Sequence, residues 1–180
     1  MRSDSPITRV FANVAMRSMA ERIAGLERLR PMHEARDPDG FKRIEEQQRS
    51  PDRYEVLVRL SAELSDGRRI QSPGTDFSIG APRRGIGAIH HRYRGPPLPD
   101  DETEQRAALD DYHVGPWDIE SAIDQMLGRD PEQHRPPRLS WGNLVKALAD
   151  VGVVVSEDDL VDAPLTVEFD ADVRSLFEDG

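Results

Sequence analysis

The sequence contains no cysteine, which excludes disulfide bonds and thiolate chemistry. It also lacks any apolar run of about 18 residues, so we expect no membrane-spanning helix and no membrane partner. The first six residues hold one basic side chain, and no continuous apolar segment follows them, which is unlike a secretory signal. From these absences we expect a cytoplasmic protein.

Motifs for catalysis and cofactor binding are missing as well. There is no G-x-S-x-G nucleophile motif and no P-loop lysine, and Gly85-Ile86-Gly87 lacks the third glycine of a dinucleotide-binding fingerprint. The five histidines never recur at the HxH or HxxxH spacing typical of metal sites. We therefore expect no cofactor and no metal, and the chain leans away from an enzyme. Abundant carboxylates leave acid–base chemistry open, as does a hydrolase that uses His90, His91 or His113.

Lysine is scarce, and charge is unevenly distributed. Only Lys42 and Lys146 are lysines among the 24 basic residues. Residues 1–95 hold 18 basic and 13 acidic side chains, a net charge of +5, whereas residues 96–180 hold 6 and 21, a net charge of −15. Such asymmetry predicts that the halves attract each other, that they face different partners, or that the acidic half only confers solubility.

A basic segment rich in proline and glycine, residues 72–99, separates these halves. No carboxylate occurs from Phe77 to Leu98. One interpretation is a connector or docking segment that pairs with the acidic half. The other is a site for an anionic partner, with arginines on phosphates and Tyr93 or the histidines stacking on bases. The candidate anion- or partner-binding residues are Arg83, Arg84, His90, His91, Arg92, Tyr93 and Arg94.

Hydrophobic spacing predicts two helices before residue 50. Ser5-Pro6 is a typical helix start, and apolar residues at spacings of three to five predict an amphipathic helix to about Arg30, ended by Pro31. Asp37-Pro38 predicts the start of a second helix, which runs on the surface to about Arg49.

The clearest strand covers Arg53 to Leu64, where apolar and polar residues alternate. Asp66-Gly67 then predicts a hairpin. A three-residue loop places Ala62 opposite Ile70 and keeps the apolar face together, whereas a two-residue loop does not. We expect Phe77–Ile79 to form a third strand and Ile86–Tyr93 a fourth.

Beyond residue 99 the pattern turns helical. Ser140 is expected to cap one helix, Ser156 a short helical turn and Asp170 the last helix. Trp117 and Trp141 lie on expected helix faces, where core packing is the favoured role and a protein interface the alternative. The expected helices cover about 100–112, 117–127 and 140–152, and the expected short strands are Val153–Val155 and Leu165–Phe169.

Together these patterns predict an α+β fold of 180 residues. An N-terminal amphipathic helix packs on a small antiparallel sheet (residues 1–71). The basic connector or docking segment (72–99) and an acidic, mainly helical part with two short strands (100–180) follow, and whether the parts share one core stays open. The leading functional hypothesis is a non-enzymatic adaptor or assembly protein that binds another protein through its acidic helices. The alternatives are a nucleic-acid-associated regulator that uses Arg83–Arg94, and an acidic mimic of nucleic acid.

Overall fold

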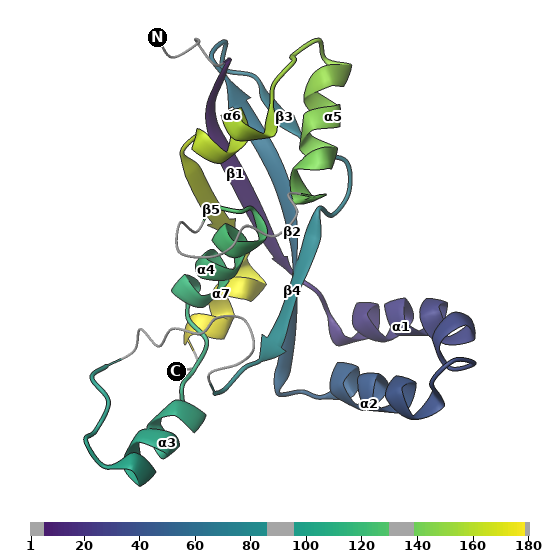
Figure 1. Cartoon of the computed structure of the whole chain (residues 1–180), viewed down its shortest axis with the longest axis vertical. Coiled ribbons are helices and arrows are strands. Elements are labelled where there is room, and N and C mark those ends of the chain that lie inside the picture. Colours follow the sequence, from purple (N-terminus) through teal and green to yellow (C-terminus); the bar gives the residue numbers. More distant parts are fainter. Residues whose placement is uncertain (1–5, 86–95, 130–138, 179–180) are drawn as a thin grey trace.

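The protein is an α+β fold built on a mixed sheet, described here from a computed structural model that covers residues 6–85, 96–129 and 139–178 (Figure 1). Five strands in these ranges form the sheet, in the order β3-β2-β1-β5, and β4 pairs with the other end of β2. The β1–β2, β2–β3 and β2–β4 pairs are antiparallel, whereas β5 runs parallel to β1. The strands are β1 (Ile7–Met16), β2 (Arg53–Leu64), β3 (Arg69–Gln71), β4 (Phe77–Pro82) and β5 (Leu165–Phe169).

One face of the sheet forms the core, because side chains on a strand alternate between its two faces. Val10, Val14 and the alternate residues of β2 from Tyr54 to Leu64 are buried on this face. Helices of the second half pack against it (Figure 1). Their residues Ile119, Trp141 and other buried side chains belong to the same hydrophobic cluster as the strands, so both halves of the chain contribute to one core.

The second half of the chain holds most of the helices in the described ranges. Helix α3 buries none of its residues, whereas the helices after it contribute to the core. Among the described residues, no helix combines the length and apolar composition needed to cross a bilayer. The helices are α3 (Glu102–Asp110), α4 (Pro116–Met126), the 3₁₀ turn η1 (Leu139–Trp141), α5 (Gly142–Asp150), α6 (Glu157–Asp162) and α7 (Ala171–Glu178).

Two further helices, α1 (Met19–His33) and α2 (Pro38–Arg49), connect β1 to β2. They form a hairpin that projects from the end of the sheet, and we call it the arm (Figure 1). Ser18 caps α1 in a reciprocal capping box with Glu21, and Asp37 caps α2 at the expected position. The start and end expected for the second helix are therefore confirmed.

The expected N-terminal helix is wrong for residues 7–16, which form β1. The spacing of Ile7, Val10 and Val14 fits a helix, and the small residue Ala12 weakens the alternation that marks a strand. In the fold, Ala12 is fully buried between partners on both sides, Leu60 of β2 and Val167 of β5. Pairing with these distant strands overrides the local pattern.

The expected hairpin is confirmed in its register. Ala62 lies opposite Ile70, Leu64 N donates to Arg68 O at 2.8 Å, and Gly67 adopts a φ of 84°, which a side chain would strain. The expected strand at Phe77–Ile79 is confirmed as part of β4.

Predictions for the second half are confirmed in part. The strand at Leu165–Phe169 and the capping roles of Ser156 and Asp170 are confirmed. The strand expected at Val153–Val155 is wrong: the segment has no strand pairing, and the Val154 side chain is 89% exposed. Ser140 does not cap α5, which follows directly on η1. The acidic half thus contributes one strand within the described residues.

The basic segment 72–99 takes part in the sheet, because β4 lies inside it. Just after β4, Val114 N donates to Arg83 O at 3.2 Å and Gly85 N donates to Tyr112 O at 2.7 Å. These bonds tie the segment to the loop before α4. The strand expected at Ile86–Tyr93 lies outside the described residues.

Asp170 joins the end of β1 to the start of α7, so its replacement tests this junction. Its Oδ1 accepts from Val173 N at 2.7 Å and its Oδ2 from Met16 N at 3.1 Å. We expect Asp170→Ala to lower the free energy of unfolding by about 1–3 kcal/mol, measured by urea denaturation. Asp172→Ala, at an exposed position in the same helical turn, should cost less than about 1 kcal/mol. Equal losses would contradict the assigned role.

Asp76 makes stability depend on pH. Burial raises its pKa above the ordinary 3.8, against hydrogen bonds from Ser72 and from Leu60 N, which lies 2.7 Å from Oδ2. Because the folded chain binds this proton more tightly, the stabilising contribution is complete below the unfolded pKa and is lost as pH rises through the folded pKa. As the pH rises from about 3.5 to 6, the free energy of unfolding of the wild type should fall relative to that of Asp76→Asn. A difference that stays constant with pH would refute this assignment.

Candidate functional site

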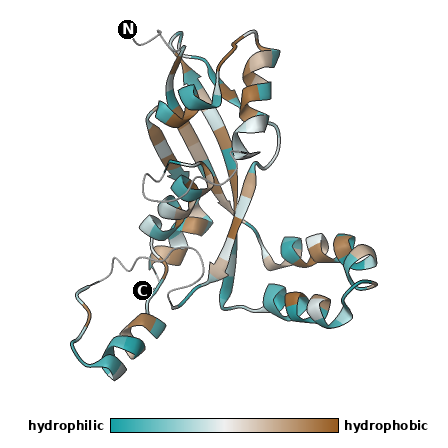
Figure 2. Cartoon of the chain, in the orientation of Figure 1, coloured by the Kyte–Doolittle hydropathy of each residue, from teal (hydrophilic) through white to brown (hydrophobic). Residues whose placement is uncertain are grey.

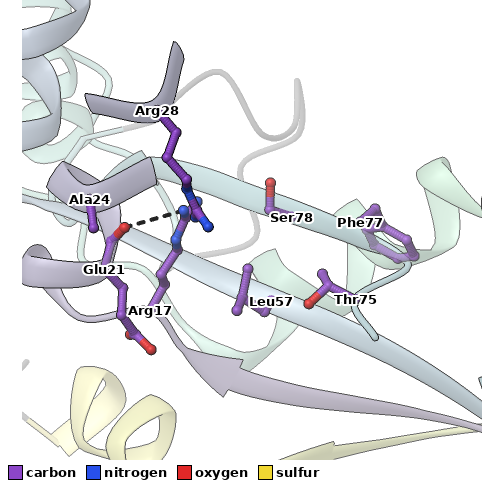
Figure 3. A pocket seen from close by; sticks show the side chains of 8 residues that line it. All are labelled: Arg17, Glu21, Ala24, Arg28, Leu57, Thr75, Phe77 and Ser78. Carbon is purple, nitrogen blue, oxygen red and sulfur yellow. Dashed lines mark hydrogen bonds between the residues drawn. The ribbon is translucent and has the colours of Figure 1, made fainter. Parts of the chain in front are cut away.

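Two open depressions meet at the base of the arm. The first, of about 700 Å³, lies between α1 and the sheet, where Leu57 and Ser78 face Ala24 of α1 (Figure 3). The second, of about 560 Å³, lies between α1 and α2, and Leu26, Leu29 and Ile44 are among its walls. Arg17 and Arg28 line both depressions, so the two form one basic corner between arm and sheet.

Arg17 connects the arm to β2. Its Nη1 donates to Glu55 Oε1 at 2.8 Å, and its backbone N donates to Glu55 O at 2.9 Å. Its Nη2 also reaches Glu21 O on α1 at 3.3 Å, the bond drawn in Figure 3. Glu55 is buried, so removing its partner would leave a carboxylate poorly hydrated. This pair therefore sets how the arm leaves the sheet.

Gly25 makes room for Arg17 on the surface of α1. A Cβ atom at this position would lie 2.3 Å from Arg17 Nη2, well inside contact distance. Glycine inside a helix is unfavourable by roughly 1 kcal/mol relative to alanine. Gly25 therefore weakens α1, but the absence of a side chain leaves space for the Arg17 guanidinium on the helix surface.

The arm is held together mainly by contacts between its own helices. Phe41 of α2 and Leu26 of α1 are buried, and the Arg30 guanidinium lies 4.8 Å from the centre of the Phe41 ring. Arg30 also pairs with Glu27 at 2.8 Å and with Glu45 of α2 at 3.1 Å. The hydrogen bonds that Arg30 donates to Glu27 are the largest cause that raises the pKa of Arg30. These contacts make the arm a defined hairpin.

Large apolar side chains remain uncovered on the arm. Seven such side chains are exposed among the described residues, and four of them lie on the arm. Figure 2 shows hydrophobic residues along both arm helices as well as in the sheet. The four are Met19, Leu29, Met32 and Ile44, which are 37%, 45%, 59% and 44% exposed.

The residues proposed from sequence do not gather at this corner as a group. Arg83 and Arg84 are exposed, and their backbones pair with Asp52 and His113. Trp117 is half-buried at the start of α4. Trp141 is fully buried, and its Nε1 donates to Leu127 O at 3.1 Å, which places it in the core. The remaining candidates, His90, His91, Arg92, Tyr93 and Arg94, lie outside the described residues.

Metal binding finds no support in the part of the chain that the structure describes, where no three His, Asp or Glu side chains gather closely enough to hold an ion. Sequence reasoning missed the corner formed by Arg17 and Glu55. The available signal was the charged residues that alternate along β2, because they mark the face of the strand opposite the core. Recognising their partners required the position of the arm.

Comparison with known proteins gave no family for this chain. No family model, no curated protein and no solved structure matched it. The functional argument therefore rests on the geometry of the chain itself.

The close approach of Gly25 and Arg17 can be tested by a double-mutant cycle. In the wild type, the helix gain from Gly25→Ala should be offset by displacement of Arg17, whereas in an Arg17→Met background it should appear as about 1 kcal/mol of added stability. Urea unfolding of the four proteins measures the coupling. Gly142→Ala is the control, because a Cβ there meets nothing within 4 Å, and it should add independently of Arg17→Met. Additive effects for Gly25→Ala would contradict the contact.

Proposed function

We propose that this chain is a non-enzymatic binding protein that holds another protein on its arm. The supporting observation is the concentration of exposed apolar side chains on a helical hairpin that projects from the sheet. Exposed apolar groups that cluster on one element are typical of interaction surfaces, whereas scattered ones need no explanation. Helical faces commonly dock with apolar side chains at spacings of three and four residues, and Leu29 and Met32 have such a spacing.

The charge at the base of the arm indicates which partner fits. Arg28 is exposed beside Leu29, and among the described residues no carboxylate forms an ion pair with it. The half of the chain that carries the arm has a net charge of +5. The partner surface therefore presents apolar side chains next to a carboxylate, and an acidic rim would also speed the encounter.

The acidic half offers a second surface for the same class of function. Helix α3 has no buried residue, and Asp101, Glu102 and Glu104 lie at its start. Nucleic-acid binding through Arg83–Arg94 and mimicry of nucleic acid by the acidic half remain the alternatives predicted from sequence. The arm carries the stronger argument, because it adds uncovered apolar area to charge.

Matched triple variants test the arm. The full chain serves as bait in the organism that encodes it, and captured complexes are analysed by size and stoichiometry. Leu29→Ser with Met32→Ser and Ile44→Ser should weaken a stoichiometric complex by about a hundredfold or more, because burial of each of these apolar side chains against the partner contributes roughly 1 kcal/mol or more. The control changes to serine the three exposed large apolar residues that the structure describes outside the arm, namely Met126, Val151 and Val154, and should leave the complex intact.

Two results would overturn the proposal. One is a complex that survives the arm triple variant and is lost when carboxylates of α3 are neutralised. The other is a dimer of the isolated chain that the arm triple variant abolishes, since the occupant of the arm would then be a second copy of this protein.

A further inference from the structure

A buried arginine without adequate partners lies beside the depression between the arm helices. Arg22 of α1 is only 5% exposed, and its Nε and Nη1 atoms find no hydrogen-bond partner among the described residues. Its Nη2 reaches Ser50 O at 3.5 Å, the outer limit of a hydrogen bond. A guanidinium remains protonated in proteins, so its free energy is raised when burial leaves these donors unpaired.

Positive charge surrounds this group. Burial lowers the pKa of Arg22, Glu55 opposes this effect, and the charges of Arg53, Arg83 and Arg17 add to it. Glu55 is already paired with Arg17 at 2.8 Å. Among the described residues, the charges that act on Arg22 are thus those of three arginines and of one carboxylate that is already engaged, an arrangement that favours a bound anion.

Two further buried atoms nearby lack partners within the described residues. One of these atoms is Arg53 Nε. The Arg53 guanidinium lies close to Gly80, where a Cβ would be 2.9 Å from Arg53 Nη2. Gln48 Oε1, on the wall of the same depression as Arg22, is the other, and it needs a donor. Native proteins satisfy most buried polar groups, so the unpaired atoms of Arg22 and Gln48 at one depression indicate a ligand.

A purely structural role for Arg22, as a link between α1 and the end of α2, does not explain its unpaired donors. Such a link would use its donors, whereas among the described residues Nη2 makes one contact at the limit and the other two nitrogens make none. Arg22 is one of the residues that line the depression, so its unpaired donors lie next to the space that a ligand would occupy.

We propose that the depression between α1 and α2 binds a phosphate group through Arg22, with Arg17 and Arg28 on its walls. A phosphate monoester carries close to two negative charges at neutral pH and three acceptor oxygens, which suits several unpaired N–H donors better than a single carboxylate does. The apolar walls Leu26, Leu29 and Ile44 accommodate an organic group, and Gln48 Oε1 accepts from a hydroxyl on it. The ligand class is therefore free phosphate or a small hydroxylated phosphate ester.

The test uses the isolated full chain, so its outcome is independent of any protein partner of the arm. Calorimetry and thermal unfolding are followed with inorganic phosphate, with glycerol 3-phosphate, and with chloride at matched ionic strength. We expect phosphate, but not chloride, to raise the melting temperature by roughly 5–10 °C at about a hundred times its Kd. Tighter binding of glycerol 3-phosphate assigns the apolar wall to an organic group, and equal affinity assigns the site to the free ion.

Three variants locate the site. Arg22→Met should weaken phosphate binding at least about tenfold, because it removes charged hydrogen bonds. Arg28→Met should weaken it several-fold, whereas Arg43→Met, an equal change of charge at an exposed position of α2, should leave it unchanged. The proposal is overturned if phosphate acts only as chloride does, or if Arg22→Met binds phosphate as the wild type does. Should Arg22→Met not fold, Arg28→Met decides alone, and unchanged binding by it would refute the site.

Discussion

The antiparallel pairing of β1 with β2 is the constraint on which the rest of the structure depends. It runs from Ile7 opposite Leu64 to Met16 opposite Val56, and the bond from Arg17 N to Glu55 O continues it by one step. The chain between these strands must leave and return at the same end of the sheet. Two antiparallel helices meet that requirement, and the arm therefore stands where the ladder ends.

The same pairing places unlike chemistry on the two faces of the sheet. One face belongs to the core shared by both halves of the chain. On the opposite face, Arg69 connects the strands: it pairs with Glu168 of β5 at 2.8 Å and lies 3.8 Å from the centre of the Phe11 ring. Near the arm, the arginines around Arg22 outnumber the carboxylates. Four of the seven exposed large apolar side chains among the described residues, and the incompletely paired guanidinium of Arg22, thus belong to the arm.

How far the sequence predicts this structure depends on whether local pattern and distant pairing agree. Along β2 they agree, so the strand, its hairpin register and Gly67 could be predicted. At residues 7–16 they conflict, because Ala12 interrupts the apolar alternation and β5 lies more than 150 residues away in the chain. Val153–Val155 has the composition of a strand but pairs with no strand among the described residues. The basic corner could not be predicted, because its members come from the link between β1 and α1, from α1 and from β2, and meet only through the arm.

The position of β5 has a consequence for synthesis of the chain. Val10 pairs with Leu165, more than 150 residues later in the chain, so one edge of β1 stays open until β5 has been synthesised. Contacts between such distant residues close slowly, because a long loop must be ordered before they form. The pairing of β1 with β2 joins residues that are closer in sequence, so it can form before β5 is made. Until then, the edge of β1 that β5 covers is available to other chains.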